Sequence, residues 1–107
     1  MVTFMIEASY TPEAIAAMVK NPQDRAAAVR PMIEKMGGKL IGLWFAYGDR
    51  DIVAIAEAPD GVTAVALGMA VSKSGAMRSY RTTPLLSSAE AMQAMRKASD
   101  TPYQAPK

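Results

Sequence analysis

Residues 40–61 read LIGLWFAYGDRDIVAIAEAPDG, two apolar strand-like runs joined by a short polar turn and followed by a Pro-Asp-Gly stop. A strand with one face in water alternates apolar and polar residues. The second run is instead apolar on both faces, with Ile52, Ala54 and Ala56 on one and Val53 and Ile55 on the other. A chain of 107 residues has few helices to cover both faces of a sheet, so we expect the second face to meet another copy of the protein.

The composition is typical of one globular domain. Half of the residues are apolar and 21% are charged, with a net charge of +2, which is too apolar for a disordered chain. Lys and Arg form neither a block nor a stripe interleaved with aromatic residues, so we expect no nucleic-acid partner. No apolar run approaches the roughly 20 residues that span a bilayer. The first ten residues, MVTFMIEASY, are more typical of a strand than of a signal peptide, so we expect no membrane partner.

Histidine and cysteine are both absent. Their absence removes zinc sites of the usual ligand sets, and also Ser-His-Asp and Cys-His nucleophilic machinery. We expect neither a metal nor a cofactor. Any catalysis would depend on Asp, Glu, Tyr, Lys or Arg, or on a substrate that is already reactive. A chain without cysteine also fits a reducing, cytoplasmic environment.

Turn and cap residues divide the chain into strands and helices. Strands are expected at residues 2–9, 39–47, 51–58 and 76–83, the last of them closed by Pro84. Helices are expected to begin at Thr11-Pro12, Asn21-Pro22, Asp60 and Ser87, where capping side chains precede a helical pattern. Gly37-Gly38 ends the second helix, and Pro31 inside it predicts a kink or a break.

The helices carry residues at helical spacing that predict their buried faces. On the second helix these are Arg25, Val29, Met32, Ile33 and Met36. On the third helix we expect a buried stripe of Val62, Val65, Ala66 and Met69, and the last helix presents Met92 and Met95. We interpret the methionines as adaptable packing and not as metal ligands.

This order of elements predicts an α+β fold. A βαββαβ chain with right-handed crossovers forms a ferredoxin-like, four-stranded antiparallel sheet with its helices on one face. The other face is bare, and two such faces packed together make a dimeric α+β barrel. We expect a single domain over residues 1–100 and a loose tail over residues 101–107. The expected partner is a second copy bound through the open sheet face, with further assembly through the tail as an additional possibility.

The segment GGKLIGLWFAYGDRDIVAIAEAPDG resembles the GYD-domain family of small bacterial proteins. The shared pattern is a Gly-Gly helix end, an apolar strand, a G-x-Y-D turn, a second apolar strand and a Pro-Asp stop. The resemblance extends over most of the chain and includes Thr11, Arg25, Leu67-Gly68, Gly75 and the run from Arg78 to Arg81. The resemblance implies the dimeric α+β barrel. It implies no particular activity, because none is established for the family. The chain departs from the motif at Arg50, where the family has Tyr. We interpret Gly48, Asp49 and Asp51 around it as turn residues.

Six residues on or beside the strands are the candidate ligand-binding residues. A ligand site is expected between the sheet and its helices or at the mouth of the half-barrel, lined by Trp44, Tyr47 and Tyr80 and oriented by Glu7, Glu57 and Arg78. Together with Phe45, these three aromatic residues fit the core and rim of a dimer interface better than a pocket. Glu7 and Glu57 lie in apolar strands, where a desolvated carboxylate can act as a general base, or where each can pair with Arg78 or Arg81.

Two functions remain open from the sequence. The first is a small homodimeric protein that binds a small aromatic or anionic ligand. The alternative is a cofactor-independent enzyme of the dimeric α+β barrel class, a monooxygenase or an isomerase, for which the sequence identifies no catalytic residue. A deep pocket that holds a desolvated Glu or Tyr favours the enzyme, and a barrel filled with side chains favours a purely structural role.

Overall fold

The computed structural model describes all 107 residues, and its centre is one four-stranded sheet. The strands are β1 (Val2–Tyr10), β2 (Lys39–Phe45), β3 (Ile52–Ala58) and β4 (Met77–Leu85). The helices are α1 (Pro12–Lys20), α2 (Arg25–Lys35), α3 (Gly61–Ser72) and α4 (Ser88–Ser99). The strand order is β2-β3-β1-β4, and each neighbouring pair is antiparallel. The predicted α+β, ferredoxin-like sheet is therefore confirmed.

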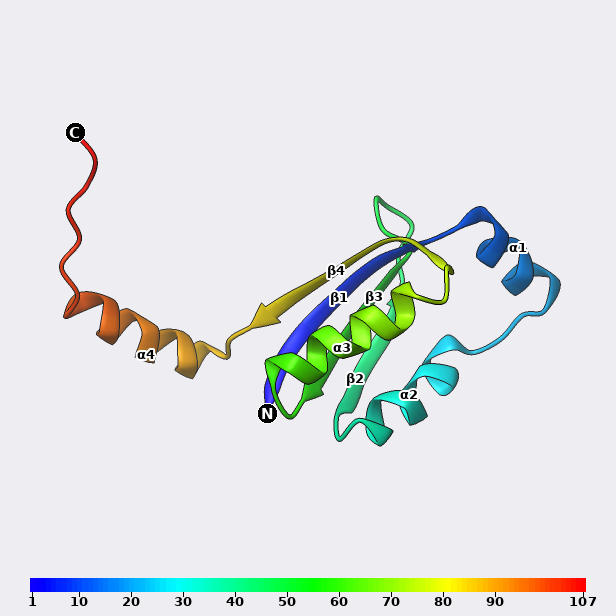
Figure 1. Ribbon diagram of the computed structural model, residues 1–107, viewed down its shortest axis with the longest axis horizontal. Coiled ribbons are helices and arrows are strands. Elements are labelled where there is room, and N and C mark those ends of the chain that lie inside the picture. The colour runs from blue at the N-terminus through cyan, green and yellow to red at the C-terminus, as the bar shows by residue number, and fades with distance from the viewer.

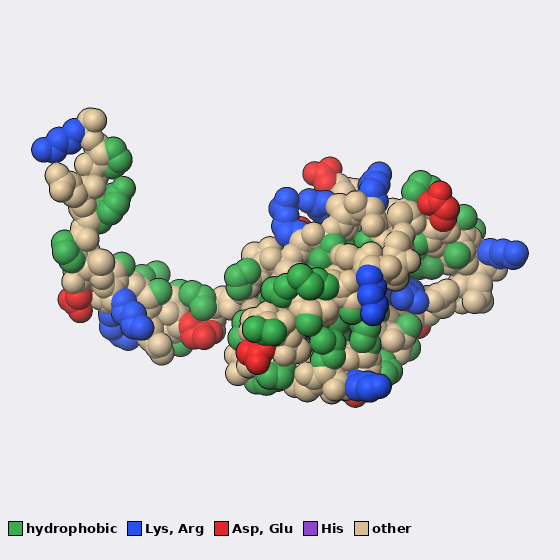
Figure 2. Space-filling model, viewed as in Figure 1, with side chains coloured by type: hydrophobic (Ala, Val, Ile, Leu, Met, Phe, Trp, Pro, Cys, Tyr) green, Lys and Arg blue, Asp and Glu red, His purple; other side chains and the backbone are tan.

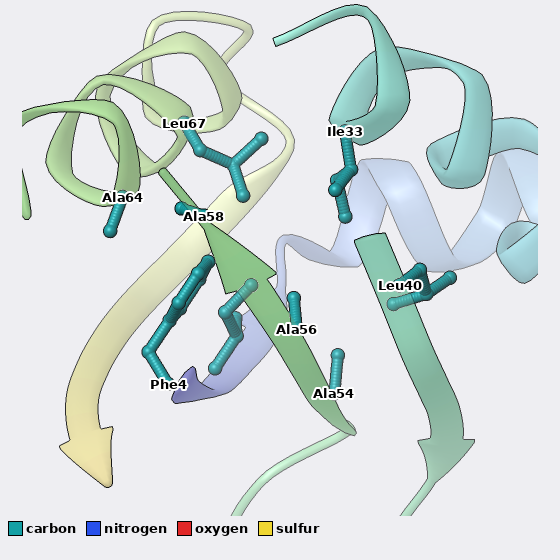
Figure 3. Packing of buried hydrophobic residues seen from close by; sticks show 9 residues of the cluster. Phe4, Ile33, Leu40, Ala54, Ala56, Ala58, Ala64 and Leu67 are labelled. Carbon is teal, nitrogen blue, oxygen red and sulfur yellow. The ribbon is translucent and has the colours of Figure 1, made fainter. Parts of the chain in front are cut away.

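Helices α2 and α3 cover one face of the sheet (Figure 1). The alternate residues Ile52, Ala54, Ala56 and Ala58 of β3 are buried on this face, beside Phe4 of β1. Figure 3 shows Leu67 of α3 and Ile33 of α2 reaching toward this row from two sides. The other set of β3 residues, Val53 and Ile55, is only partly buried. The sequence left open which set forms the core, and the structure resolves it.

The uncovered side of the sheet, called the open face below, has its own order of side chains. Cross-strand partners share a face, and Met5 lies opposite Ile55 at its centre. Glu7 lies between Val53 on one side and Arg81 on the other, and Glu57 lies opposite Lys39. The open face is therefore apolar at its centre, with opposite charges placed across neighbouring strands around it.

Side-chain caps begin every helix. Thr11 accepts a hydrogen bond from the Ala14 N–H, Asp60 accepts one from the Thr63 N–H, and Ser87 and Glu90 form a reciprocal capping box. The predicted cap at Asn21 is wrong. The Asn21 N–H still bonds the Ala17 carbonyl at 2.9 Å, so this residue ends α1. Asp24 caps α2 instead, accepting from the Ala27 N–H at 3.2 Å.

Two further expectations about strand and helix interiors need correction. Helix α2 runs unbroken through Pro31. Both Pro31 and Ala27, whose carbonyl loses its partner, are exposed, so no unsatisfied group is buried in the core. Strand β4 continues through Pro84 to Leu85, because β4 is at the edge of the sheet, where proline is tolerated.

The buried face of α3 is the largest correction. Ala64, Leu67 and Gly68 are buried against the sheet. Of the expected stripe, Val62, Val65 and Met69 are exposed and Ala66 is only partly buried. Helix α3 contains no charged residue, so its pattern does not distinguish one face from another. The helix packs close to the sheet, and the face that carries the small residues Ala64 and Gly68 allows this close packing.

Helix α4 stands away from the rest of the molecule (Figure 1), whereas α1 packs only Ala14 and Met18 against the small cluster of Ala8, Tyr10 and Ile52. Neither helix contains a buried residue. The radius of gyration is 17.1 Å, compared with about 13 Å for a compact chain of this length. The chain as a monomer is therefore extended, and α4 leads away from the sheet as an arm.

The turn between α2 and β2 depends on Gly38. The Gly38 N–H donates to the Ile33 carbonyl at 3.0 Å and the Gly37 N–H donates to the Glu34 carbonyl at 2.9 Å, a Schellman arrangement with Gly37 at a φ of 85°. A Cβ at position 38 would lie 2.4 Å from the Glu57 carbonyl oxygen.

Gly38→Ala is therefore expected to lower the free energy of unfolding by about 2 kcal/mol, because backbone has to move to relieve the clash. Gly48→Ala is the matched control, since a Cβ there meets nothing, and its effect should stay within about 0.5 kcal/mol. Urea unfolding at one protein concentration measures both. Equal stability of the two variants would contradict this account of the turn.

Candidate functional site

A cavity of about 240 Å³ lies between the sheet and helices α2 and α3. Of its 17 lining residues, 15 are hydrophobic, so it is suited to an apolar molecule. An apolar cavity of about 150 Å³ is enough for benzene, so this one has room for a single substituted ring. The lining residues are Ile6, Ala8, Tyr10, Arg25, Val29, Met32, Ile33, Leu43, Ile52, Ala54, Leu67, Ala70, Val71, Ser74, Ala76, Met77 and Tyr80.

Small residues create the space. Ala8 and Ala54 line the cavity from the central strands β1 and β3, where a larger side chain would fill it. Gly68 of α3 has a related role at one side. A Cβ at position 68 would lie 2.8 Å from the Tyr80 ring, so glycine allows that ring to lie directly against α3.

Two polar side chains enter this apolar space without partners for all of their polar atoms. The Arg25 Nε and the Tyr80 hydroxyl are both buried and make no hydrogen bond. Arg25 is anchored on its outer side, where Nη1 donates to Gln23 Oε1 at 2.6 Å. Buried polar atoms are normally satisfied by protein groups or ordered water. The cavity is therefore lined by two side chains that each retain an unused capacity to donate a hydrogen bond.

The surroundings of Tyr80 affect its ionisation. Burial raises the pKa of the phenol above its ordinary value of 10.0, and the nearby Thr82 hydroxyl opposes the shift. By distance and angle the phenol oxygen makes no full hydrogen bond, so the opposing effect of Thr82 is the smaller of the two. Tyr80 is therefore protonated at neutral pH and can act as a hydrogen-bond donor.

The six predicted site residues do not gather at one place. Tyr80 lines the cavity, whereas Glu7, Trp44 and Glu57 lie on the open face. Tyr47 is fully exposed in the turn after β2, and Arg78 is exposed near the start of β4. Only the aromatic ring of Tyr80 thus occupies the space between sheet and helices where a ligand was expected.

Trp44 has a structural setting of its own. Its indole lies over Gly42 on the open face, so close that a Cβ at position 42 would be 2.5 Å from the ring. The β2 ladder is irregular between Leu40 and Gly42. Trp44 therefore belongs with Val53, its cross-strand neighbour, on the surface that faces away from the helices.

Comparison with known proteins identifies the family. The family model of the GYD domain matches residues 4–95. The chain belongs to the GYD-domain family. No curated protein matches the chain. Among solved structures, the crystal structure of MtbAldR is similar, with a TM-score of 0.58 and 14% sequence identity. The likeness covers 80% of this chain and 53% of that chain, so the chain spans about half the length of MtbAldR. At this identity it shows the fold alone.

The turn that gives the GYD family its motif has a structural role in this member. The Asp51 carboxylate accepts a hydrogen bond from the Tyr10 N–H at 2.9 Å, and the Asp51 N–H donates to the Ala8 carbonyl at 3.0 Å. Arg50, at the motif's Tyr position, donates to Ser79 Oγ at 2.9 Å. The turn thereby fastens the ends of β1 and β4, and Tyr10 lines the cavity.

The sequence predicted that Arg25 lies on a buried face of α2 but did not identify it as a site residue. The pattern that could have identified it is its helical register with the apolar residues Val29, Met32 and Ile33. A charged residue in an apolar stripe requires a partner or a ligand. The acidic residues of the domain form no group that could hold a metal ion. No helix has both the length and the apolar character needed to cross a membrane.

Tyr80→Phe is expected to raise the free energy of unfolding by about 1 kcal/mol, because it removes a buried hydroxyl that has no partner. Tyr47→Phe, at a fully exposed position, is the control and should change little. Loss of stability in Tyr80→Phe would show that the phenol is hydrogen-bonded in the free protein.

The same variant tests the pKa shift. The unfolded chain ionises Tyr80 near pH 10.0, below the folded pKa, so deprotonation favours unfolding. This contribution to stability is complete below about pH 10 and is lost as the pH rises through the folded pKa. Urea unfolding measured from neutral pH to about pH 11 should therefore show that the free energy of unfolding falls more steeply with pH for the wild type than for Tyr80→Phe.

Proposed function

We propose that this GYD-domain protein is a homodimer that binds a small aromatic molecule carrying an anionic group. The observation that supports this function is the apolar cavity whose lining includes Arg25 and Tyr80, each with one buried polar atom, Nε and Oη, that has no hydrogen-bond partner. A bacterial source and a cytoplasmic location remain predictions from the sequence.

The two polar groups define the chemistry of the ligand. Arginine only donates hydrogen bonds, carries a permanent positive charge and matches the planar geometry of a carboxylate. Protonated Tyr80 adds a second donor. The remaining lining is almost entirely apolar. A ring with a carboxylate or an oxyanion satisfies both donors and fills the apolar space.

The enzyme alternative has one observation in its favour, the buried Tyr80 in a cavity. Its pKa is raised and not lowered, so Tyr80 can donate a proton or a hydrogen bond but cannot act as a base at neutral pH. No carboxylate lines the cavity, since Glu7 and Glu57 lie on the open face. Binding therefore accounts for the site better than isomerisation or oxygenation, which need a group to remove a proton.

The open face supports the proposed homodimer. Met5, Val53 and Ile55 form an apolar centre that no helix of the chain covers. The charged residues around that centre, Glu7, Arg81, Glu57 and Lys39, give it the polar rim of an association surface. A second copy that packs its own open face there makes the dimeric α+β barrel and leaves each cavity on the outer, helical side.

Arg25→Met tests the ligand site, because it removes the charge and keeps the apolar stem. Benzoate is the probe, and benzamide is its neutral analogue. Wild-type protein is expected to bind benzoate, and Arg25→Met should weaken that binding by about tenfold, the value of one charge-assisted hydrogen bond. Benzamide binding should change much less.

Arg30→Met is the matched control, since Arg30 lies on the exposed side of the same helix. It should bind benzoate as the wild type does in isothermal titration calorimetry. Failure of wild-type protein to bind either compound, or an equal loss in the two arginine variants, would contradict the proposed site.

Ile55→Asp tests the dimer. Placing a carboxylate at the apolar centre of the open face is expected to dissociate the protein to monomers at micromolar concentration. Ala28→Asp adds the same charge on the exposed side of α2 and should remain dimeric. Sedimentation velocity gives the masses, and a dimeric Ile55→Asp protein or a monomeric wild type would refute this interface.

A further inference from the structure

Helix α4 is a complete helix with nothing packed against it. Its first turn is closed by the capping box, in which the Ser87 N–H donates to Glu90 Oε1 at 2.9 Å and the Glu90 N–H donates to Ser87 Oγ at 3.1 Å. It has no buried residue and makes hardly any contact with the rest of the chain. Isolated helices of about 12 residues are only marginally stable in water. The helix therefore requires a partner surface.

One side of α4 is suited to such a surface. Met92 and Met95 lie on it, with Ala91 and Ala98 in helical register. Met95 is 66% exposed. The charged residues Glu90 and Lys97 lie to the other side, so α4 presents one apolar stripe and no second one.

The counterpart is the outer side of α3. Val62, Val65 and Met69 form a stripe there, and Val62 and Met69 are 80% and 67% exposed. Figure 2, viewed from the helical side, shows hydrophobic side chains gathered over α3. A helix that is apolar on all sides is normally buried on all sides. The stripe on α3 is thus uncovered, as is the stripe on α4.

We propose that α4 of one chain packs its methionine stripe across the α3 stripe of a second copy. The charges at the helix ends specify an antiparallel arrangement. Arg96, which is in the last turn of α4 and four residues after Met92, then lies near Asp60, the cap of α3. A parallel arrangement would place Arg96 beside Lys73 at the end of α3 instead, which like-charge repulsion disfavours.

The short connection between β4 and α4 argues against the same contact within one chain. Only Leu86 and Ser87 join the two elements, and the three Cα–Cα steps from Leu85 to Ser88 reach at most about 11 Å. A helix on the outer side of α3 is separated from the sheet by α3 itself, and its axis lies a further 8–10 Å, roughly, beyond the α3 axis. Such a helix therefore begins farther from the sheet than this linker extends. Short hinges of this kind are typical of exchanged elements.

This contact is separate from the open face and from the cavity. The α3 stripe lies on the helical side, away from the dimer interface proposed above. The contact therefore joins chains beyond that dimer, and it can exist whether or not a ligand binds.

The natural absence of cysteine allows a direct test with two full-length variants, Val65→Cys and Met95→Cys. Mixed and mildly oxidised, they are expected to form a disulfide between chains that joins positions 65 and 95, identified by peptide mass spectrometry. Gln93→Cys, on the opposite side of α4, replaces Met95→Cys as the matched control. Because a disulfide needs Cα atoms within about 7 Å, the yield should be at least ~10-fold higher with Met95→Cys.

Sedimentation of full-length protein gives a second measurement. Met92→Glu/Met95→Glu should lower the mass of the assembly, whereas Gln93→Glu should leave it unchanged. Equal cross-linking by the two α4 positions would overturn the proposal. So would a double variant, Val65→Cys/Met95→Cys, whose disulfide forms only within one chain, as would an assembly mass that neither set of α4 substitutions alters.

Discussion

The structure depends on the small size of the alanines at the centre of the sheet. On the side of the sheet that faces the helices, β3 presents only the short side chains of Ala54, Ala56 and Ala58, and β1 adds Ala8. The helices contribute larger side chains, Leu67 from α3 and Ile33 from α2 (Figure 3). Where the helix side chains contact the alanines, they form the core. Where they do not fill the space above the sheet, the cavity remains. Core and candidate site are thus two results of one packing arrangement.

The chemistry of the cavity is set by residues that the fold holds in place for other reasons. Arg25 begins α2 directly after its capping residue, Asp24, and Tyr80 is pressed against α3 because position 68 is glycine. Both groups are donors at neutral pH, and no acidic side chain is near enough to line the space. The site is consequently complementary to an acceptor, and the fold supplies this preference before any ligand is present.

Several parts of this structure could be predicted from the sequence, because the local preference of the residues agrees with their place in the tertiary structure. Asp60 and Ser87 cap helices through their own neighbouring N–H groups, and Gly37-Gly38 ends α2 through the local chain reversal. The exposed side of α3 was not readable, because a helix without charges has no periodic difference to detect. The site was only partly readable. Tyr80 was identified from its strand, but its distance in sequence from Arg25 hides the fact that the fold brings the two to one cavity.

The place of β1 in the sheet has a consequence for how the chain acquires its structure during synthesis. The first strand made is an inner strand, paired with β3 and β4 and not with its sequence neighbour β2. Only β2 and β3 form a hairpin between strands that are neighbours in the sequence, so that hairpin can form early. Strand β1 pairs with strands roughly 40 or more residues further along the chain, and these pairings require long loops to close. The last pairing, Thr3 with Leu85, spans most of the chain. A nascent chain therefore holds an apolar β1 with at least one free edge until β4 leaves the ribosome, and this interval is when the protein is most exposed to aggregation.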